Sequence, residues 1–437
     1  MNRSFRLITE RILRWTNAVL GLNVRMFAKD AAIVTTGHGV SVLRGIVTGY
    51  LVARLFPREA YGSYQFILSI MGMIGIIAIP SLAQSLGRAV ARGKDGAILP
   101  VLRRQLQICL VGSALLLGSI PFLQYFDRGN LWPLFVMAAV LFPVSQVALT
   151  VFHGIVVGKR RFDISLKSNI AWSIAMVIVT LGIIFLHPSA SLLFVAVTAL
   201  PAISYLFFVR GLVPRKGDEA EAAAVMTYGI QLTLAQLPIL LSWYVDKLII
   251  TAYLGLNQLA IFSVAILIPE QVKTWAKELL PVSFAVQARG DDTFARRKRL
   301  IRAVGSSTAV FLLGIAAYVV LAPWIFPLLF PNYPEAVILS QVAALTLITQ
   351  PSALLSQYIE AQAMLPAIRR TQWISAIIFL LSLVILIPTL GLLGAVLARG
   401  TLRLSYALCS LWFLLTMGPL DEPAKAASSL VRPRKRD

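Results

Sequence analysis

The chain has 437 residues, of which 58% are hydrophobic and only 14% charged, and its mean hydropathy is +0.79. A soluble domain of this length would leave too much apolar surface unburied, which excludes that class. The formal net charge is +21, but the basic residues lie in short loops beside apolar segments and have no interleaved aromatic platform. This favours contact with anionic membrane lipids and argues against nucleic acid as a partner.

The apolar residues fall in blocks of the length that a helix needs to cross about 30 Å of hydrocarbon, roughly 20 residues. These blocks lack the period-2 alternation of a barrel. The sequence therefore predicts an all-α integral membrane protein with about 12 transmembrane helices. The predicted spans are 31–56, 63–86, 105–125, 132–157, 168–186, 191–210, 226–252, 257–284, 303–329, 336–362, 373–390 and 393–417.

Residues 1–30 precede the first span and lack the uninterrupted apolar core of a signal peptide. Their apolar residues recur at spacings of three and four, which is typical of an amphipathic helix; they are Phe5, Ile8, Ile12, Trp15 and Val19. Since basic residues occupy the other face, we expect this helix to lie on the cytoplasmic face of the membrane. A structural anchor is the simpler role for it, and a gate or a docking helix is the alternative.

The connections between spans alternate in charge along the chain. Most of the 40 Lys and Arg residues lie in the N-terminal tail, in every second connection and in the basic tail 418–437, whereas Arg58 and Arg128 stand alone in the opposite connections. Under the positive-inside rule both termini are cytoplasmic in a multi-pass protein of a bacterial inner membrane. Cys109 and Cys409 lie inside spans and predict no disulfide, metal site or cofactor.

Two stretches of the chain repeat each other. Residues 51–64 align without a gap with 249–262, and 91–95 align with 288–292 one helix later. This predicts an N-lobe at 31–212, a cytoplasmic linker at 213–225 and a C-lobe at 226–417. Because each lobe has six spans, the repeat is parallel, with its axis along the membrane normal and a central cleft between the lobes.

Three segments of the chain resemble a known family. The run 51–57 (LVARLFP) with Tyr61 and Gly62, the stretch 246–265, and the loop 330–336 (FPNYPEA) are similar to segments of the polysaccharide flippases in the multidrug and oligosaccharidyl-lipid exporter superfamily. Pro331 stands where Gly is usual in that family. The resemblance implies a V-shaped bundle that carries undecaprenyl-diphosphate-linked oligosaccharides, such as O-antigen or exopolysaccharide units, to the outer leaflet. A polysaccharide polymerase and a chain-length regulator are further candidate partners.

Charged residues inside the spans are the candidate site residues, since each is costly in hydrocarbon and usually faces protein or water. Gly37, Ser41, Arg44 and Thr48 share one face of the first span. The candidates for a cationic, substrate-binding cleft are Arg44, Arg403, Arg399, Lys273 and Lys277. The candidates for ion coupling or gating are Asp246, Lys247, Glu270 and Glu360.

Several of these residues also have a simpler interpretation. Lys273 and Lys277 could extend to the interface, paired with Glu270 or Glu278, and Asp246 with Lys247 could form a structural ion pair. Glu360 could be a solvated end residue. Arg44 and Arg403 lie too deep to reach the interface easily, which favours function.

Three functions compete on the sequence. A flippase for a lipid-linked, anionic glycan fits the cationic faces, because a diphosphate in a low-dielectric cleft needs positive charge. A drug or cation antiporter would concentrate acidic groups in the cavity. A glycan polymerase or ligase would need a large outer loop with catalytic groups, whereas the predicted outer connections are short and show no catalytic constellation. We therefore expect a transporter and not an enzyme.

Overall fold

The computed structural model describes residues 24–121, 129–186, 189–214, 216–278, 294–361 and 365–416. The predicted amphipathic helix falls mostly outside these residues, and only its end, from Val24, is described as the start of the first long helix. The predicted tail at 418–437 also lies outside them.

All regular structure in the described ranges is helical. In the first half of the chain the helices are α2 (Val24–Leu55), α3 (Arg58–Ile74), α4 (Leu82–Ala91), η1 (Asp95–Ala97), α5 (Ile98–Gly118), η2 (Gly129–Leu131), α7 (Trp132–Gly158), α8 (Phe162–Leu186) and α9 (Ala190–Val209). In the second half they are α10 (Glu219–Ser242), α11 (Val245–Leu254), α12 (Leu256–Glu278), α14 (Phe294–Leu329), α15 (Ala336–Leu345), η3 (Thr346–Ser352), α16 (Ala353–Ala361), α17 (Leu365–Leu390) and α18 (Leu392–Thr416).

Nine segments in the described part of the chain are long and apolar enough to cross a membrane. The protein is thus an all-helical membrane protein, as the composition predicts. Three further predicted spans correspond to α2, to α3 with α4, and to α12, which are not among the nine. Each of the three is interrupted or carries ionisable residues, so length and hydropathy alone do not identify it.

The predicted continuous helix at 63–86 is wrong. It is broken into α3 and α4 by the turn 75–81, in which Ile79 has a φ of 58°. Pro80 follows, and a proline disfavours helical backbone in the residue before it. The span predicted at 336–362 is likewise divided, with the 3₁₀ turn η3 around Pro351 between α15 and α16.

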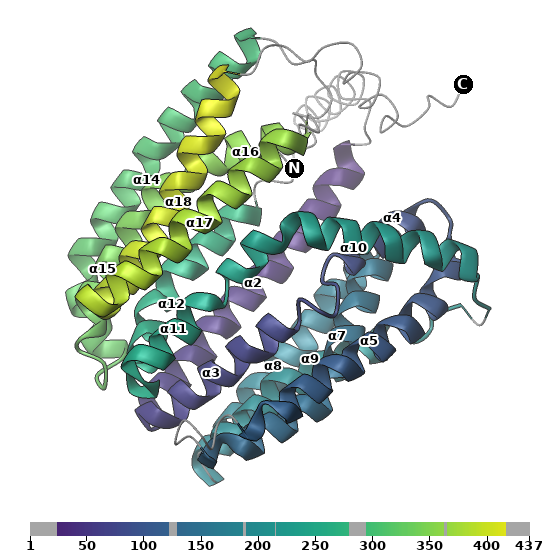
Figure 1. Ribbon diagram of the computed structural model, residues 1–437, viewed down its shortest axis with the longest axis horizontal. Coiled ribbons are helices and arrows are strands. Elements are labelled where there is room, and N and C mark those ends of the chain that lie inside the picture. The colour runs from purple at the N-terminus through teal and green to yellow at the C-terminus, as the bar shows by residue number, and fades with distance from the viewer. Residues whose placement is uncertain are drawn as a thin grey trace, which may run out of the picture.

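The helices form two groups (Figure 1). In the first half, α7 packs against α4, α5 and α9, and α2 packs against α8. In the second half, α17 and α18 lie side by side and α14 packs against α15. Helix α10 joins the groups, since it contacts both α4 and α17. The outward faces carry exposed apolar side chains such as Val140, Ile178 and Leu313, as expected where lipid is the solvent.

The halves meet most closely where α3 crosses α12. A Cβ atom added to Gly62 would overlap the backbone oxygen of Leu256, so only glycine permits this approach. Beside the crossing, Arg58 at the start of α3 forms a 3.3 Å ion pair with Glu335 and donates a hydrogen bond to the carbonyl of Asn332. These contacts tie the two halves together at the end that the charge pattern assigns to the outside.

Candidate functional site

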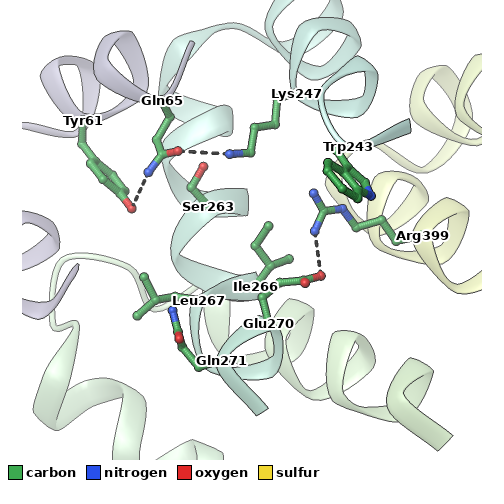
Figure 2. A pocket seen from close by; sticks show the side chains of 10 residues that line it. All are labelled: Tyr61, Gln65, Trp243, Lys247, Ser263, Ile266, Leu267, Glu270, Gln271 and Arg399. Atoms are coloured by element: carbon green, nitrogen blue, oxygen red, sulfur yellow. Dashed lines mark hydrogen bonds and ion pairs between the residues drawn. The ribbon is translucent and has the colours of Figure 1, made fainter. Parts of the chain in front are cut away.

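A pocket of about 270 Å³ opens between the two halves. Its walls come from α3, α11, α12 and α18 and from the turn after α10 (Figure 2). The residues that line it are Tyr61, Gln65, Trp243, Lys247, Ser263, Ile266, Leu267, Glu270, Gln271 and Arg399. We call it the interface pocket. Three of the charged residues that the sequence singles out line it, namely Lys247, Glu270 and Arg399.

Arg399 on α18 connects two carboxylates. Its Nε donates to Asp246 Oδ2 at 2.5 Å and its Nη1 donates to Glu270 Oε1 at 2.9 Å. The Asp246 side chain has no exposed surface, and its other oxygen accepts the backbone N–H of Lys247 at 2.7 Å. Because a carboxylate this deep needs full compensation, Arg399 and the helix backbone hold Asp246 in place.

Glu270 on α12 forms ion pairs with three cationic side chains. Besides Arg399, it accepts a hydrogen bond from Arg403 Nη2 at 2.5 Å and from Lys273 Nζ at 2.6 Å. Arg403 also donates through Nη1 to Thr346 Oγ1 at 2.6 Å, which extends the cluster to η3. The spacing of four residues between Arg399 and Arg403 places both on one face of α18.

Lys247 points across the pocket toward the other half (Figure 2). Its Nζ lies 3.2 Å from Gln65 Oε1 on α3, and Gln65 Nε2 donates to the Tyr61 hydroxyl at 2.9 Å. No ion pair of Lys247 is found within the described ranges, so its ammonium has only a neutral amide partner there. This chain of hydrogen bonds is a second polar link between the halves.

The cluster as a whole has an excess of positive charge. Two carboxylates, Asp246 and Glu270, face the cationic side chains of Arg399, Arg403, Lys273 and Lys247. The described residues contain no group of three or more His, Cys, Asp or Glu side chains that could hold a metal. An arrangement of this kind can bind an anion, since guanidinium and ammonium groups are strong phosphate donors.

Arg44 lies elsewhere, in the first half. Its guanidinium carbon is 3.5 Å from the centre of the Trp172 ring on α8, and its Nε has no hydrogen-bond partner among the described residues. The polar face that the sequence predicts on α2 also packs against α8, since the Ser41 hydroxyl on α2 donates to Asn169 Oδ1 on α8 at 3.1 Å. Arg44 therefore takes no part in the ion pairs that Arg399 and Arg403 form with Asp246 and Glu270.

The side chains of two other candidates, Lys277 and Glu360, lie outside the described residues. Lys277 lies near the end of α12 and Glu360 near the end of α16.

The interpretation of Asp246 and Lys247 as an ion pair with each other is wrong. Consecutive residues do not face each other on a helix, and Asp246 pairs instead with Arg399, 153 positions away. Pairing of Lys273 with Glu270 is confirmed.

Sequence reasoning missed Tyr61, Gln65, Trp243 and Thr346, which are polar or aromatic but uncharged. A signal for Gln65 was available, since it is an amide inside a predicted span.

These features define an all-helical membrane protein with a polar, cation-rich pocket between two helical groups. The sequence profile of the family described as polysaccharide biosynthesis protein matches residues 27–268, more than half of the chain. The chain belongs to this family. Among curated proteins, none matches its sequence.

Solved structures support the fold assignment. The chain is similar to the lipid II flippase MurJ in an inward closed conformation, with a TM-score of 0.74 and 12% identity over 91% of this chain and 90% of that one. It is similar to an inward-facing multidrug resistance MATE family transporter of the MOP superfamily, with a TM-score of 0.66 and 15% identity over 90% and 96%. A MOP superfamily transporter from Pyrococcus furiosus, with a binding pocket of reverse polarity, has a TM-score of 0.57 and 12% identity over 92% and 95%. At these identities the likeness establishes the fold.

Proposed function

We propose that the protein is a flippase that moves an undecaprenyl-diphosphate-linked oligosaccharide, an O-antigen or exopolysaccharide repeat unit, from the cytoplasmic to the outer leaflet. The observation that carries this proposal is the excess of cationic side chains in the interface pocket. A lipid diphosphate is the anion that a polysaccharide biosynthesis protein of the membrane would meet, and Arg and Lys donors bind its oxygens strongly.

The excess of cationic side chains also favours a flippase over the two alternative functions. A cation or drug antiporter needs accessible acids, but Glu270 in the interface pocket and the buried Asp246 are both bound to guanidinium groups. A glycan polymerase or ligase would need catalytic groups around an acceptor site, and the described part of the pocket offers ion pairs that hold helices together. Transport without covalent chemistry fits these residues best.

Transport by alternating access requires two bodies that can rock against each other. We propose twelve transmembrane helices in two lobes, 31–212 and 226–417, joined by the linker 213–225 and related by a parallel repeat. One observation in support is that α3 and α12, the helices that the repeat makes equivalent, are in direct contact, as elements beside a common axis would be. The lobes would then open as a V around the interface pocket.

The orientation is part of the proposal. We place both termini in the cytoplasm of a bacterial inner membrane, with anionic lipids against the basic loops. The links from Arg58 to Glu335 and Asn332 then close the outer side, and substrate would enter from the cytoplasm. A polysaccharide polymerase and a chain-length regulator would receive the product. The mechanism needs no cofactor.

The test is reconstitution of the purified protein in proteoliposomes that contain a fluorescent undecaprenyl-diphosphate-linked sugar. Movement of the label between leaflets, at a rate well above that of empty liposomes, is the expected result. Absence of lipid movement, together with proton- or sodium-driven efflux of a cationic dye, would instead establish the antiporter.

A further inference from the structure

A second cavity, also of about 270 Å³, lies within the first half between α3, α7, α8 and α9. We call it the N-half pocket. Its polar and aromatic lining residues are Ser145, Gln146, Trp172, Thr198 and Tyr205, and the rest of the wall is mostly apolar. Its volume is near the lower end of small-molecule sites, roughly 300 Å³, so it suits one small ring better than a whole oligosaccharide.

Trp172, which lines this pocket, and Arg44, which stacks on Trp172, each have a hydrogen-bond donor without an acceptor among the described residues. Trp172 is 8% exposed, and its indole Nε1 has no partner among the described residues. Arg44 Nε, whose guanidinium covers the Trp172 ring at 3.5 Å, also has none. Buried donors are almost always satisfied in folded proteins. Two adjacent exceptions beside a cavity point to a ligand that supplies acceptor oxygens.

The other groups of the pocket suit a hydroxylated ring. Tyr205 is held in position because its ring stacks on Phe152 at a centroid distance of 4.3 Å. Aromatic rings offer flat apolar surface to the C–H face of a sugar, while the amide of Gln146 and the hydroxyls of Ser145 and Thr198 can both donate and accept hydrogen bonds. Such a mixture of aromatic and neutral polar groups is less suited to a bare phosphate.

The N-half pocket adjoins the interface pocket along one helix. Gln65 on α3 lines the interface pocket, and Gly72, seven residues or about two turns further along α3, lines the N-half pocket. Tyr244 packs its ring on Gly72 and follows Trp243, another lining residue of the interface pocket. One ligand could therefore reach from the cationic cluster to the aromatic groups.

We propose that the N-half pocket binds the first sugar of the lipid-linked substrate, with Trp172, Tyr205 and Gln146 as recognition residues and Arg44 between sugar and diphosphate. This proposal rests on the proposed function and adds a site for the saccharide. The interface pocket then binds the charge that all such lipids share, and the N-half pocket discriminates among glycans.

The test compares two probes, undecaprenyl diphosphate and undecaprenyl-diphosphate-N-acetylglucosamine, bound to the full-length protein in nanodiscs and quantified by native mass spectrometry. Trp172→Phe keeps an aromatic ring and removes the N–H together with part of the indole surface. We expect its dissociation constant for the sugar-bearing lipid to rise roughly fivefold, the effect of one lost hydrogen bond, with less than a twofold change for the sugarless lipid. Gln146→Leu should show the same selectivity.

Trp324→Phe is the matched control, because Trp324 is 67% exposed on α14 and the same atoms are removed there. It should change neither constant. Unchanged binding of the sugar-bearing lipid by both pocket variants would overturn the sugar site, and so would an equal loss for the two lipids, which would assign the pocket to the diphosphate or the lipid chain. If the wild-type protein binds neither lipid, the proposed function itself fails.

Discussion

Arg399 Nε on α18 and Asp246 Oδ2 on α11 are joined by a 2.5 Å ion pair, and the aspartate side chain has no contact with solvent. This pair, with Glu270, connects three helices of the second half at the wall of the interface pocket. Within the described ranges, Asp246 without Arg399 keeps only the backbone N–H of Lys247, and Arg399 without Asp246 keeps only Glu270, so either loss leaves a buried charge that is incompletely compensated.

We therefore expect Asp246→Asn to reduce the stability of the purified protein by about 3 kcal/mol, in the range for breaking a buried pair. Arg399→Gln should do the same, and the double variant should recover part of the loss because no unpaired charge remains. Thermal unfolding in detergent measures the effect. Glu335→Gln is the control, since the Arg58–Glu335 pair is exposed and such pairs contribute below about 1 kcal/mol. A double variant that loses as much stability as the two single variants together would contradict an energetic coupling between Asp246 and Arg399.

The crossing of α3 and α12 yields a second prediction. Gly62→Ala places a methyl group against the backbone oxygen of Leu256, which cannot move without shifting α12. We expect the variant to open the closed end of the molecule, measured as faster labelling of a cysteine introduced at Ser263 in the interface pocket. Gly182→Ala is the control, because nothing lies within 4 Å of the added atom. An unchanged labelling rate in Gly62→Ala would mean that this crossing does not close the pocket.

The third prediction concerns topology. In a background with Cys109 and Cys409 replaced by alanine, single cysteines should label only from the cytoplasm when placed at basic residues of one set of connections. These positions are Lys94, Arg161, Lys216, Arg297, Arg369 and Arg436. A cysteine at Arg58 should label from outside. Outer labelling at any two of the six would overturn the six-plus-six scheme.

The sequence predicts most of this architecture because hydrophobic length and loop charge act locally along the chain. It fails where backbone chemistry interrupts a span, as at Pro80 between α3 and α4. Within the site, it identifies Arg399, Glu270 and Asp246, since ionisable residues in hydrocarbon are rare. It cannot assign their partners, because the pairing of Asp246 with Arg399 depends on how α11 and α18 pack. For the same reason it treats Arg44 and Arg403 alike, although one packs on Trp172 and the other binds Glu270.

The last prediction tests those two arginines in transport. Arg can donate two parallel hydrogen bonds to a phosphate, whereas Lys is a compact point charge. We expect Arg44→Lys to retain partial export and Arg44→Ala to lose most of it while the protein still accumulates in the membrane. The same order is expected at Arg403, with a smaller effect if that residue guides the glycan rather than the diphosphate.

The measurement is the amount of glycan at the surface of cells that lack the native gene, normalised to the level of each variant. Arg403→Ala needs an additional control, because Arg403 also donates to Thr346 at 2.6 Å and its loss alters packing. Thr346→Val removes that hydrogen bond and keeps the guanidinium, so it separates packing from charge. Export at the wild-type level by both alanine variants would exclude contact of these arginines with substrate and leave them as structural residues, with Lys247 as the remaining cation that faces the first half across the interface pocket.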